Sequence, residues 1–237
     1  MGKKSKISFI FRTMLLLVVL ILAITDSIKI EIKLNYKLLC GIKVFHIIWA
    51  ILFFEMIIVF IPKYNKFSYC GKHLSRHYIE ADNYNKDKLK GYTKANYNRA
   101  LKALIFWTSL NLVLVVIYNM LNLNKGWIYF LFVFYYWADM FCVNVWCPFH
   151  KIIVKNKCCN ECRIYNWGHI MYLTPLIFIF NFWSYSLVIL GVLILLQWEY
   201  QNFRYPERFS PISNKKLRCN TCDNKCRFNK NKKITYK

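Results

Sequence analysis

Residues 169–200 read HIMYLTPLIFIFNFWSYSLVILGVLILLQWEY, a run of 32 residues in which Glu199 carries the only formal charge. A membrane-spanning helix needs about 20 apolar residues, so the run is too long for one untilted crossing. Asn181 lies near its middle and predicts a tight hairpin of two short helices, 169–180 and 183–199. The alternative is a single span, 175–198, that follows an interfacial segment. The choice decides to which side the end of the chain returns.

Four further apolar runs have lengths that suit membrane spans, namely 7–25, 43–62, 103–121 and 127–146. Hydrophobic residues make up 57% of the chain, yet its formal net charge is +23. A membrane protein accommodates both values, because apolar residues gather in the spans and charges in the loops. The sequence therefore predicts an all-α polytopic membrane helix bundle of about six spans.

The basic residues predict the orientation of this bundle. In the six-span topology the segments 63–102, 147–168 and 200–237 share one side and hold 10, 4 and 11 Lys and Arg residues. Positively charged loops favour the cytosolic side, so both termini are expected there. The first run could instead be a cleaved signal peptide, because lysines precede it. Contacts with acidic lipid headgroups explain the positive charge better than nucleic acid does.

The chain divides by these features into four parts. Residues 1–146 hold four spans and the basic loop 63–102, and residues 169–200 form the membrane hairpin. Residues 147–168 form a cytosolic loop and residues 201–237 a basic tail, and both contain cysteines. The tail lacks apolar periodicity and should be loose unless something ties it down.

Seven of the ten cysteines fall in the cytosolic loop and the tail. They are Cys147, Cys158, Cys159, Cys162, Cys219, Cys222 and Cys226. The pairs Cys159/Cys162 and Cys219/Cys222 have the C-x-x-C spacing with which two knuckles form a tetrahedral four-thiolate site. The cytosol is reducing, which favours metal ligation over disulfides. We therefore expect a cytosolic metal-binding module built from the loop and the tail.

The identity of the metal stays open between zinc and an iron–sulfur cluster, because both use four thiolates. The tail spacing C-x2-C-x3-C matches no iron–sulfur signature closely. A zinc knuckle could also serve only to pin the tail to the bundle. A second candidate group is Cys70, His73 and His77, which share one face if residues 70–77 are helical, with His150 as a further donor. The alternative is a solvated basic helix.

Two carboxylates interrupt the apolar runs, Glu55 in the second and Asp139 in the fourth. Both are expected about 10–12 Å below the cytosolic surface, so they could meet. Carboxylates at this depth are typical of ion or proton routes, here one that leads toward the cysteines. The alternative is polar glue, with Asp139 accepting from a Tyr, Trp or Asn of a neighbouring helix. Glu199 is expected to pair with Arg204 or Arg208.

Two local patterns predict secondary structure outside the spans. Residues 28–34, IKIEIKL, alternate strictly, which predicts an extended strand or an interfacial strip. Residues 94–104 have helical spacing and should run directly into the third span.

Four motifs carry a resemblance to known proteins: CCNECRIYNW at 158–167, WEY at 198–200, YPERF at 205–209 and the C-x2-C-x3-C tail. Together they resemble a group of uncharacterised cysteine-rich multi-pass membrane proteins from anaerobic bacteria. The resemblance covers mainly the last 95 residues. It implies a bacterial cytoplasmic membrane and brings no known activity.

Two functions fit these features. The first is a redox or metal-handling protein whose thiolate site binds zinc or an iron–sulfur cluster, with Glu55 and Asp139 lining a path. The second is an interaction or assembly protein whose structural zinc holds a tail that docks a cytosolic protein. A lipid-modifying enzyme is a weaker third, because the sequence has no nucleophile–base set and no phosphate-binding motif.

Overall fold

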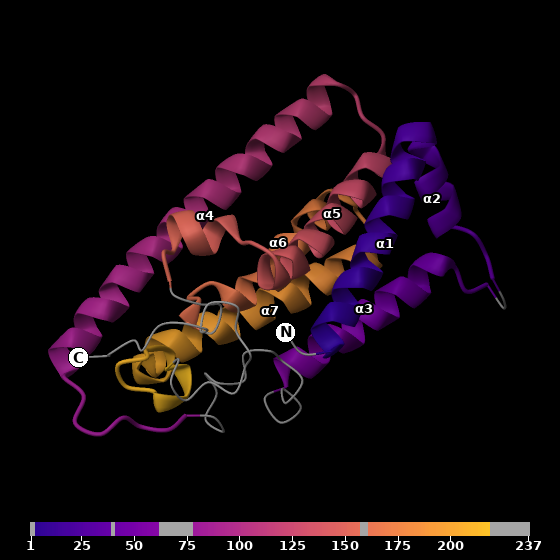
Figure 1. Ribbon diagram of the computed structural model, residues 1–237. Helices are drawn as coiled ribbons and strands as arrows, with labels where there is room; N and C mark the ends of the chain where they lie inside the picture. The colour runs from indigo at the N-terminus through magenta and orange to yellow at the C-terminus, as the bar shows by residue number, and fades with distance from the viewer. Residues whose placement is uncertain (1–2, 39–40, 62–77, 157–160, 219–237) are drawn as a thin grey trace.

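The computed structural model describes residues 3–38, 41–61, 78–156 and 161–218 (Figure 1). Within these ranges the chain is helical and has no β-strand beyond two isolated bridges. The main helices are α1 (Lys3–Asp26), α3 (Val44–Phe60), α4 (Lys86–Met120), α5 (Lys125–Asn144) and α7 (Phe182–Arg204). Of these, α1, α4, α5 and α7 are long and apolar enough to cross a membrane, and α3 is an apolar helix of 17 residues. The fold is consistent with a membrane protein.

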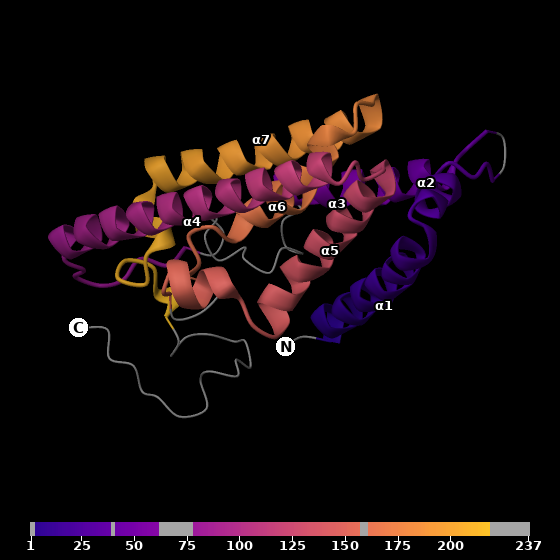
Figure 2. The same ribbon diagram turned by 90° about the horizontal axis from the view of Figure 1, so that it is seen from above.

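Contacts between the helices define two ends of the bundle. Helices α1 and α5 are antiparallel, because Arg12 contacts Asp139 while Ser27 accepts a hydrogen bond from Asn124. Helices α3 and α7 are parallel, as the bond from Gln197 to the Phe60 carbonyl shows together with the ring contact of Trp49 and Trp183. We call the end where α1 begins and α3, α5 and α7 finish the tail end (Figures 1 and 2).

The run at 169–200 forms two helical segments on either side of Asn181, as the hairpin alternative expects, but the first segment is not one continuous helix. Its first half is a short α-helix, α6 (Gly168–Leu173), followed by a 3-10 helix, η7 (Thr174–Phe178). Pro175 lies in the first turn of η7, and because it lacks an N–H it cannot continue the α-helical bonding of α6. The segment is therefore not the continuous helix expected for 169–180. Its eleven residues, at about 1.5–2.0 Å each, are also too short to cross the roughly 30 Å hydrocarbon core.

The turn at Asn181 is confirmed. Its side chain accepts a hydrogen bond from the backbone N–H of Ser184 at 2.7 Å and caps the start of α7. Helix α7 then continues to Arg204, beyond the expected end at residue 199. The main core lies where α6 and η7 insert beside α3, α5 and α7, around the fully buried side chains of Met56, Leu173 and Ile194.

The other local predictions divide. The helix expected over 94–104 is confirmed as part of α4, which begins at residue 86 behind the Asn85 cap. The strand expected at 28–34 is wrong, because these residues form α2 (Ile28–Leu34). Only Ile30 of the alternating isoleucines is buried, against Val19 and Ala23 of α1. Helix α2 therefore contacts the bundle through one buried isoleucine and does not bury a whole apolar face.

Candidate functional site

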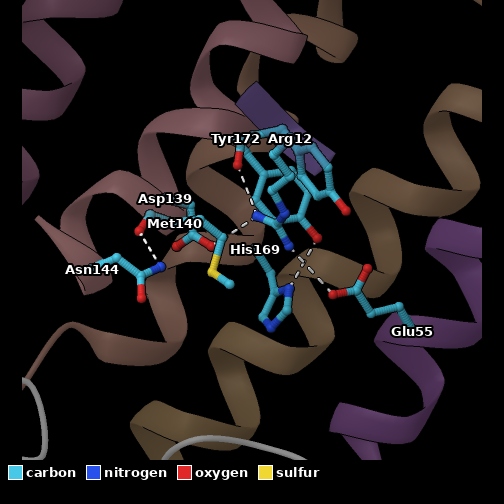
Figure 3. Close-up of polar contacts among 8 residues, drawn as sticks. Arg12, Glu55, Asp139, Met140, Asn144, His169 and Tyr172 are labelled. Carbon is cyan, nitrogen blue, oxygen red and sulfur yellow. Dashed lines mark hydrogen bonds and ion pairs between the residues drawn. The ribbon is translucent and has the colours of Figure 1, made fainter. Parts of the chain in front are cut away.

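The polar centre of the bundle is built around Arg12 of α1, whose side chain is 6% exposed. Its guanidinium lies 3.5 Å from a carboxylate oxygen of Glu55 on α3 and 3.3 Å from one of Asp139 on α5 (Figure 3). It also donates to the Tyr136 carbonyl at 2.8 Å and lies 3.6 Å from the centre of the Tyr136 ring. The two carboxylates at similar depth therefore meet, and an arginine joins them.

Sequence reasoning missed Arg12, although the signal was present. It is the one charged residue within the apolar run 7–25, and an ionisable residue in such a run calls for a partner at the same depth. The glue alternative named Tyr, Trp or Asn as the group that binds Asp139, and the group that binds it is this arginine. A guanidinium is both a better carboxylate partner and permanently charged.

Helix α6 packs against this cluster in addition to α1, α3 and α5. His169 and Tyr172 lie beside Arg12, and the His169 Nδ1 is 3.0 Å from the Tyr172 hydroxyl (Figure 3). Gly168 makes the close approach feasible, because a Cβ there would lie 2.6 Å from an Asp139 carboxylate oxygen. The cluster thus joins α1, α3, α5 and α6 at one point.

The charges in the cluster do not balance when every group is ionised. Two carboxylates face one guanidinium, and the side chains of Glu55 and Asp139 are 41% and 33% exposed. Arginine does not release its proton in proteins, so only the carboxylates and His169 can change their charge. With all three groups ionised, the two carboxylates and the one guanidinium carry a net charge of about −1.

A second arginine–carboxylate pair lies at the tail end. Arg163 binds Glu199 of α7 through both guanidinium nitrogens, one of them at 2.7 Å. The Trp167 indole donates to the same carboxylate at 2.8 Å, and the Trp198 indole donates to the Arg163 carbonyl at 2.8 Å. The expected pairing of Glu199 with Arg204 or Arg208 is wrong. Arg204 is five positions along α7 and so faces elsewhere, and Arg208 stacks on the Tyr205 ring.

The first part of the tail is fastened to the loop that precedes α4. The backbone N–H of Ala81 donates to the Ser213 carbonyl, and that of Lys215 donates to the Ile79 carbonyl, each at 2.8 Å. The Lys215 ammonium lies 2.7 Å from Asp82 and lowers the pKa of that carboxyl. Ser210, Ser213, Asn214 and Leu217 are buried. Protein contacts therefore tie the tail down as far as Arg218.

The described cysteines lie at the same end. Cys162 is buried in an apolar cluster with Trp198 and Phe209. Cys142 donates a hydrogen bond to Cys147, and this bond is the main reason that the pKa of Cys147 falls to about 7. Burial opposes this shift, and the backbone N–H of His150 supports it. A thiol with this pKa is about half thiolate at neutral pH.

The remaining candidate metal ligands lie outside the described residues: Cys70, His73, His77, Cys158, Cys159, Cys219, Cys222 and Cys226. Among the residues that the structure describes, no three His, Cys, Asp or Glu side chains are grouped to hold a metal ion. The four-thiolate module and the second group at 70–77 therefore stay predictions.

The described residues that adjoin these candidate ligands in sequence come together at the tail end. Residues 78–82, which follow His77, pair with residues 213–215, which precede Cys219. Cys162, which closes the loop cluster, packs in the same apolar cluster as Phe209 from the start of the tail. Three separate stretches of chain thus meet beside the end of α7.

Comparisons of the chain with protein-family models, with curated proteins and with solved structures found no match. The resemblance to cysteine-rich membrane proteins of anaerobic bacteria stays a prediction.

Proposed function

We propose that this chain is a multi-pass protein of a bacterial cytoplasmic membrane that binds a metal through cysteine thiolates on the cytosolic side and handles that metal or its electrons. The metal is zinc or the iron of an iron–sulfur cluster. The observation that carries the proposal is the convergence at the tail end of residues 78–82, 161–163 and 205–218. Each of these stretches adjoins one of the cysteine groups in sequence.

Convergence matters because a site built from two distant C-x-x-C knuckles must close a long loop of chain. The entropic cost of closing the loop grows with its length. Contacts of the folded protein that already hold the flanking residues together lower the part of this cost that metal binding must supply. The backbone pairing of residues 79–81 with 213–215 and the packing of Cys162 with Phe209 supply this arrangement. The hydrogen bond from Cys142 lowers the pKa of Cys147, which favours the thiolate form of this one candidate ligand.

The same contacts favour metal handling over a purely structural knuckle. As far as Arg218 the tail needs no structural zinc to hold it, because Ser213, Asn214 and Leu217 are already buried by protein contacts. A metal that is not required for anchoring is free to exchange or to change its oxidation state.

Metal analysis of protein purified without oxygen tests the proposal. We expect about one zinc per chain in a colourless protein, or iron with broad visible absorbance, by the stoichiometry of four-thiolate sites. Replacement of Cys159 or of Cys222 by Ser should remove the metal. The matched control is Cys40→Ser, which changes a cysteine outside both clusters. Metal-free wild type, or equal metal in all three variants, would contradict a thiolate site.

A chelator distinguishes metal handling from a structural role. After the metal is removed, limited trypsin digestion should still spare the bonds that follow Arg208 and Lys215. Rapid cleavage there after chelation would mean that the metal holds the tail, as in the structural alternative.

A further inference from the structure

An open groove of about 1090 Å³ separates the first half of α4 from the end of α7. Lys86, Lys90 and Lys94 line it from α4. Leu196 and Phe203 line it from α7. Figures 1 and 2 both place the start of α4 and the end of α7 at the same end of the molecule. The groove has one cationic wall and one apolar wall.

The cationic wall follows from helix geometry. The three lysines are spaced four residues apart, so they lie on one face of α4, and all three are exposed. Within the described ranges none of them forms an ion pair. The other lining cation, Arg163, is already bound to Glu199. The three ammonium groups therefore face the groove with Glu161 as the only other lining carboxylate.

The apolar wall is exposed near the end of α7. The side chains of Leu196, Tyr200 and Phe203 are 57%, 61% and 88% accessible in this structure. Below the groove, residues 103–120 of α4 contain no Asp, Glu, Lys or Arg, so the charged half of α4 stops where the apolar span begins. Trp167 and Trp198 are buried beside the Arg163–Glu199 pair, which lines the groove.

We propose that this groove binds one anionic phospholipid of the cytosolic leaflet, with its phosphate at Lys86, Lys90 and Lys94 and its upper acyl chains along Leu196 and Phe203. A soluble anion would match the lysines and leave the apolar wall in water. A zwitterionic lipid would match the apolar wall, but its own ammonium offsets its phosphate, so it would leave the charge of the three lysines uncompensated. The groove volume of about 1090 Å³ lies at the upper end of the range for small-molecule sites, so a lipid headgroup alone would not fill the groove.

This inference goes beyond the proposed metal function and depends only on the tail end facing the cytosolic leaflet. Anionic lipids in that leaflet attract basic groups by about a fivefold gain in affinity for each lysine. The lipid would also wedge α4 against α7, which few other contacts join in this part of the bundle. Metal content and lipid binding are measured separately, so one proposal can fail while the other holds.

Native mass spectrometry of the detergent-purified full chain, titrated with phosphatidylglycerol and with phosphatidylcholine, tests the site. The variant Lys86→Gln/Lys90→Gln/Lys94→Gln should lose about 100-fold in affinity for phosphatidylglycerol. The matched control Lys88→Gln/Arg99→Gln/Lys102→Gln removes the same charge from the same helix at positions that do not line the groove. It should stay within about twofold of wild type. Equal losses in both variants, or no loss in either, would overturn the site.

The apolar wall has its own test, which also separates a lipid from a free anion. Phe203→Ser removes an exposed ring, so it should fold normally and weaken long-chain phosphatidylglycerol several-fold while leaving its short-chain form unchanged. Glycerol 3-phosphate should fail to displace the long-chain lipid. Full displacement by glycerol 3-phosphate, or unchanged long-chain binding by the serine variant, would mean that no lipid-specific site exists.

Discussion

Two arginine–carboxylate clusters organise this protein, and they differ in composition and in geometry. Arg12 contacts two carboxylates, at 3.3 and 3.5 Å, and joins helices that lie 43 and 127 residues away in the chain. Arg163 holds the single carboxylate of Glu199 with two nitrogens, and a tryptophan completes the set. The first cluster carries a surplus negative charge at longer range, and the second is balanced and fully hydrogen-bonded. The comparison indicates that the second cluster is a tightly held, charge-balanced pair and the first an unbalanced cluster with looser contacts.

The largest expected effect comes from removing the arginine of the first cluster. Arg12→Leu leaves Glu55 and Asp139 facing each other without a counter-ion, which should cost about 3 kcal/mol or more of unfolding free energy. The triple variant Arg12→Leu/Glu55→Gln/Asp139→Asn should regain most of it, because neutral groups tolerate the same surroundings. Denaturant unfolding in detergent measures both. A single variant as stable as wild type would show that the cluster is solvated.

The second cluster should respond differently to loss of its carboxylate. Glu199→Ala leaves the Arg163 guanidinium and the Trp167 indole without their acceptor and should cost about 2 kcal/mol. Glu55→Gln should cost under about 1 kcal/mol, because Asp139 still pairs with Arg12 and Glu55 is partly exposed. The same unfolding assay compares the two. If Glu55→Gln lowered the unfolding free energy more than Glu199→Ala, the first cluster and not the second would be the more tightly held.

A smaller effect tests how tightly α6 closes the first cluster. Gly168→Ala places a Cβ 2.6 Å from an Asp139 oxygen, which should cost about 1 kcal/mol. In an Asp139→Ala background the penalty should vanish, since the obstructing group is gone. Gly91→Ala is the matched control, because no atom lies within 4 Å of its Cβ, and it should stabilise α4 slightly. A penalty at Gly168 that survives in the Asp139→Ala background would place the strain elsewhere.

The smallest effect is a shift in thiol reactivity. The pKa of Cys147 is about 7, so its alkylation rate should rise with pH up to about 7 and level off above it. Cys142→Ala should move the midpoint upward because it removes the hydrogen bond to the Cys147 thiolate, and Asp139→Asn should move it downward by removing a negative charge. Peptide mass spectrometry after timed iodoacetamide treatment separates Cys147 from the other thiols. A Cys147 midpoint near the ordinary thiol pKa would contradict the hydrogen bond from Cys142.

Local features of the chain were predicted well from sequence. The apolar runs at 7–25, 127–146 and 183–199 correspond to α1, α5 and α7, and the turn at Asn181 is formed by its own side chain. The helix over 94–104 continues into α4 as its spacing indicated. In each case the deciding interactions lie within a few residues of one another.

Two errors show where local reasoning stops. The alternation in 28–34 suggested a strand, but a strand needs another strand to pair its backbone, and the described neighbours of α2 are the helices α1, α3 and α5. The run at 169–180 was apolar enough for a helix, yet Pro175 and the space left between α3, α5 and α7 made it a short α-helix followed by a 3-10 turn.

The amino-acid sequence by itself determined that this chain forms apolar helices with cationic loops and that charged groups lie within those helices. Only the tertiary structure decided which charges meet: Arg12 with Glu55 and Asp139, Arg163 with Glu199, and the tail with residues 79–82. Apolar length and local turns are properties of neighbouring residues. The pairing of ions from distant helices depends on the packing of the whole bundle, because each ion's partner is set by the depth and rotation at which its helix comes to rest.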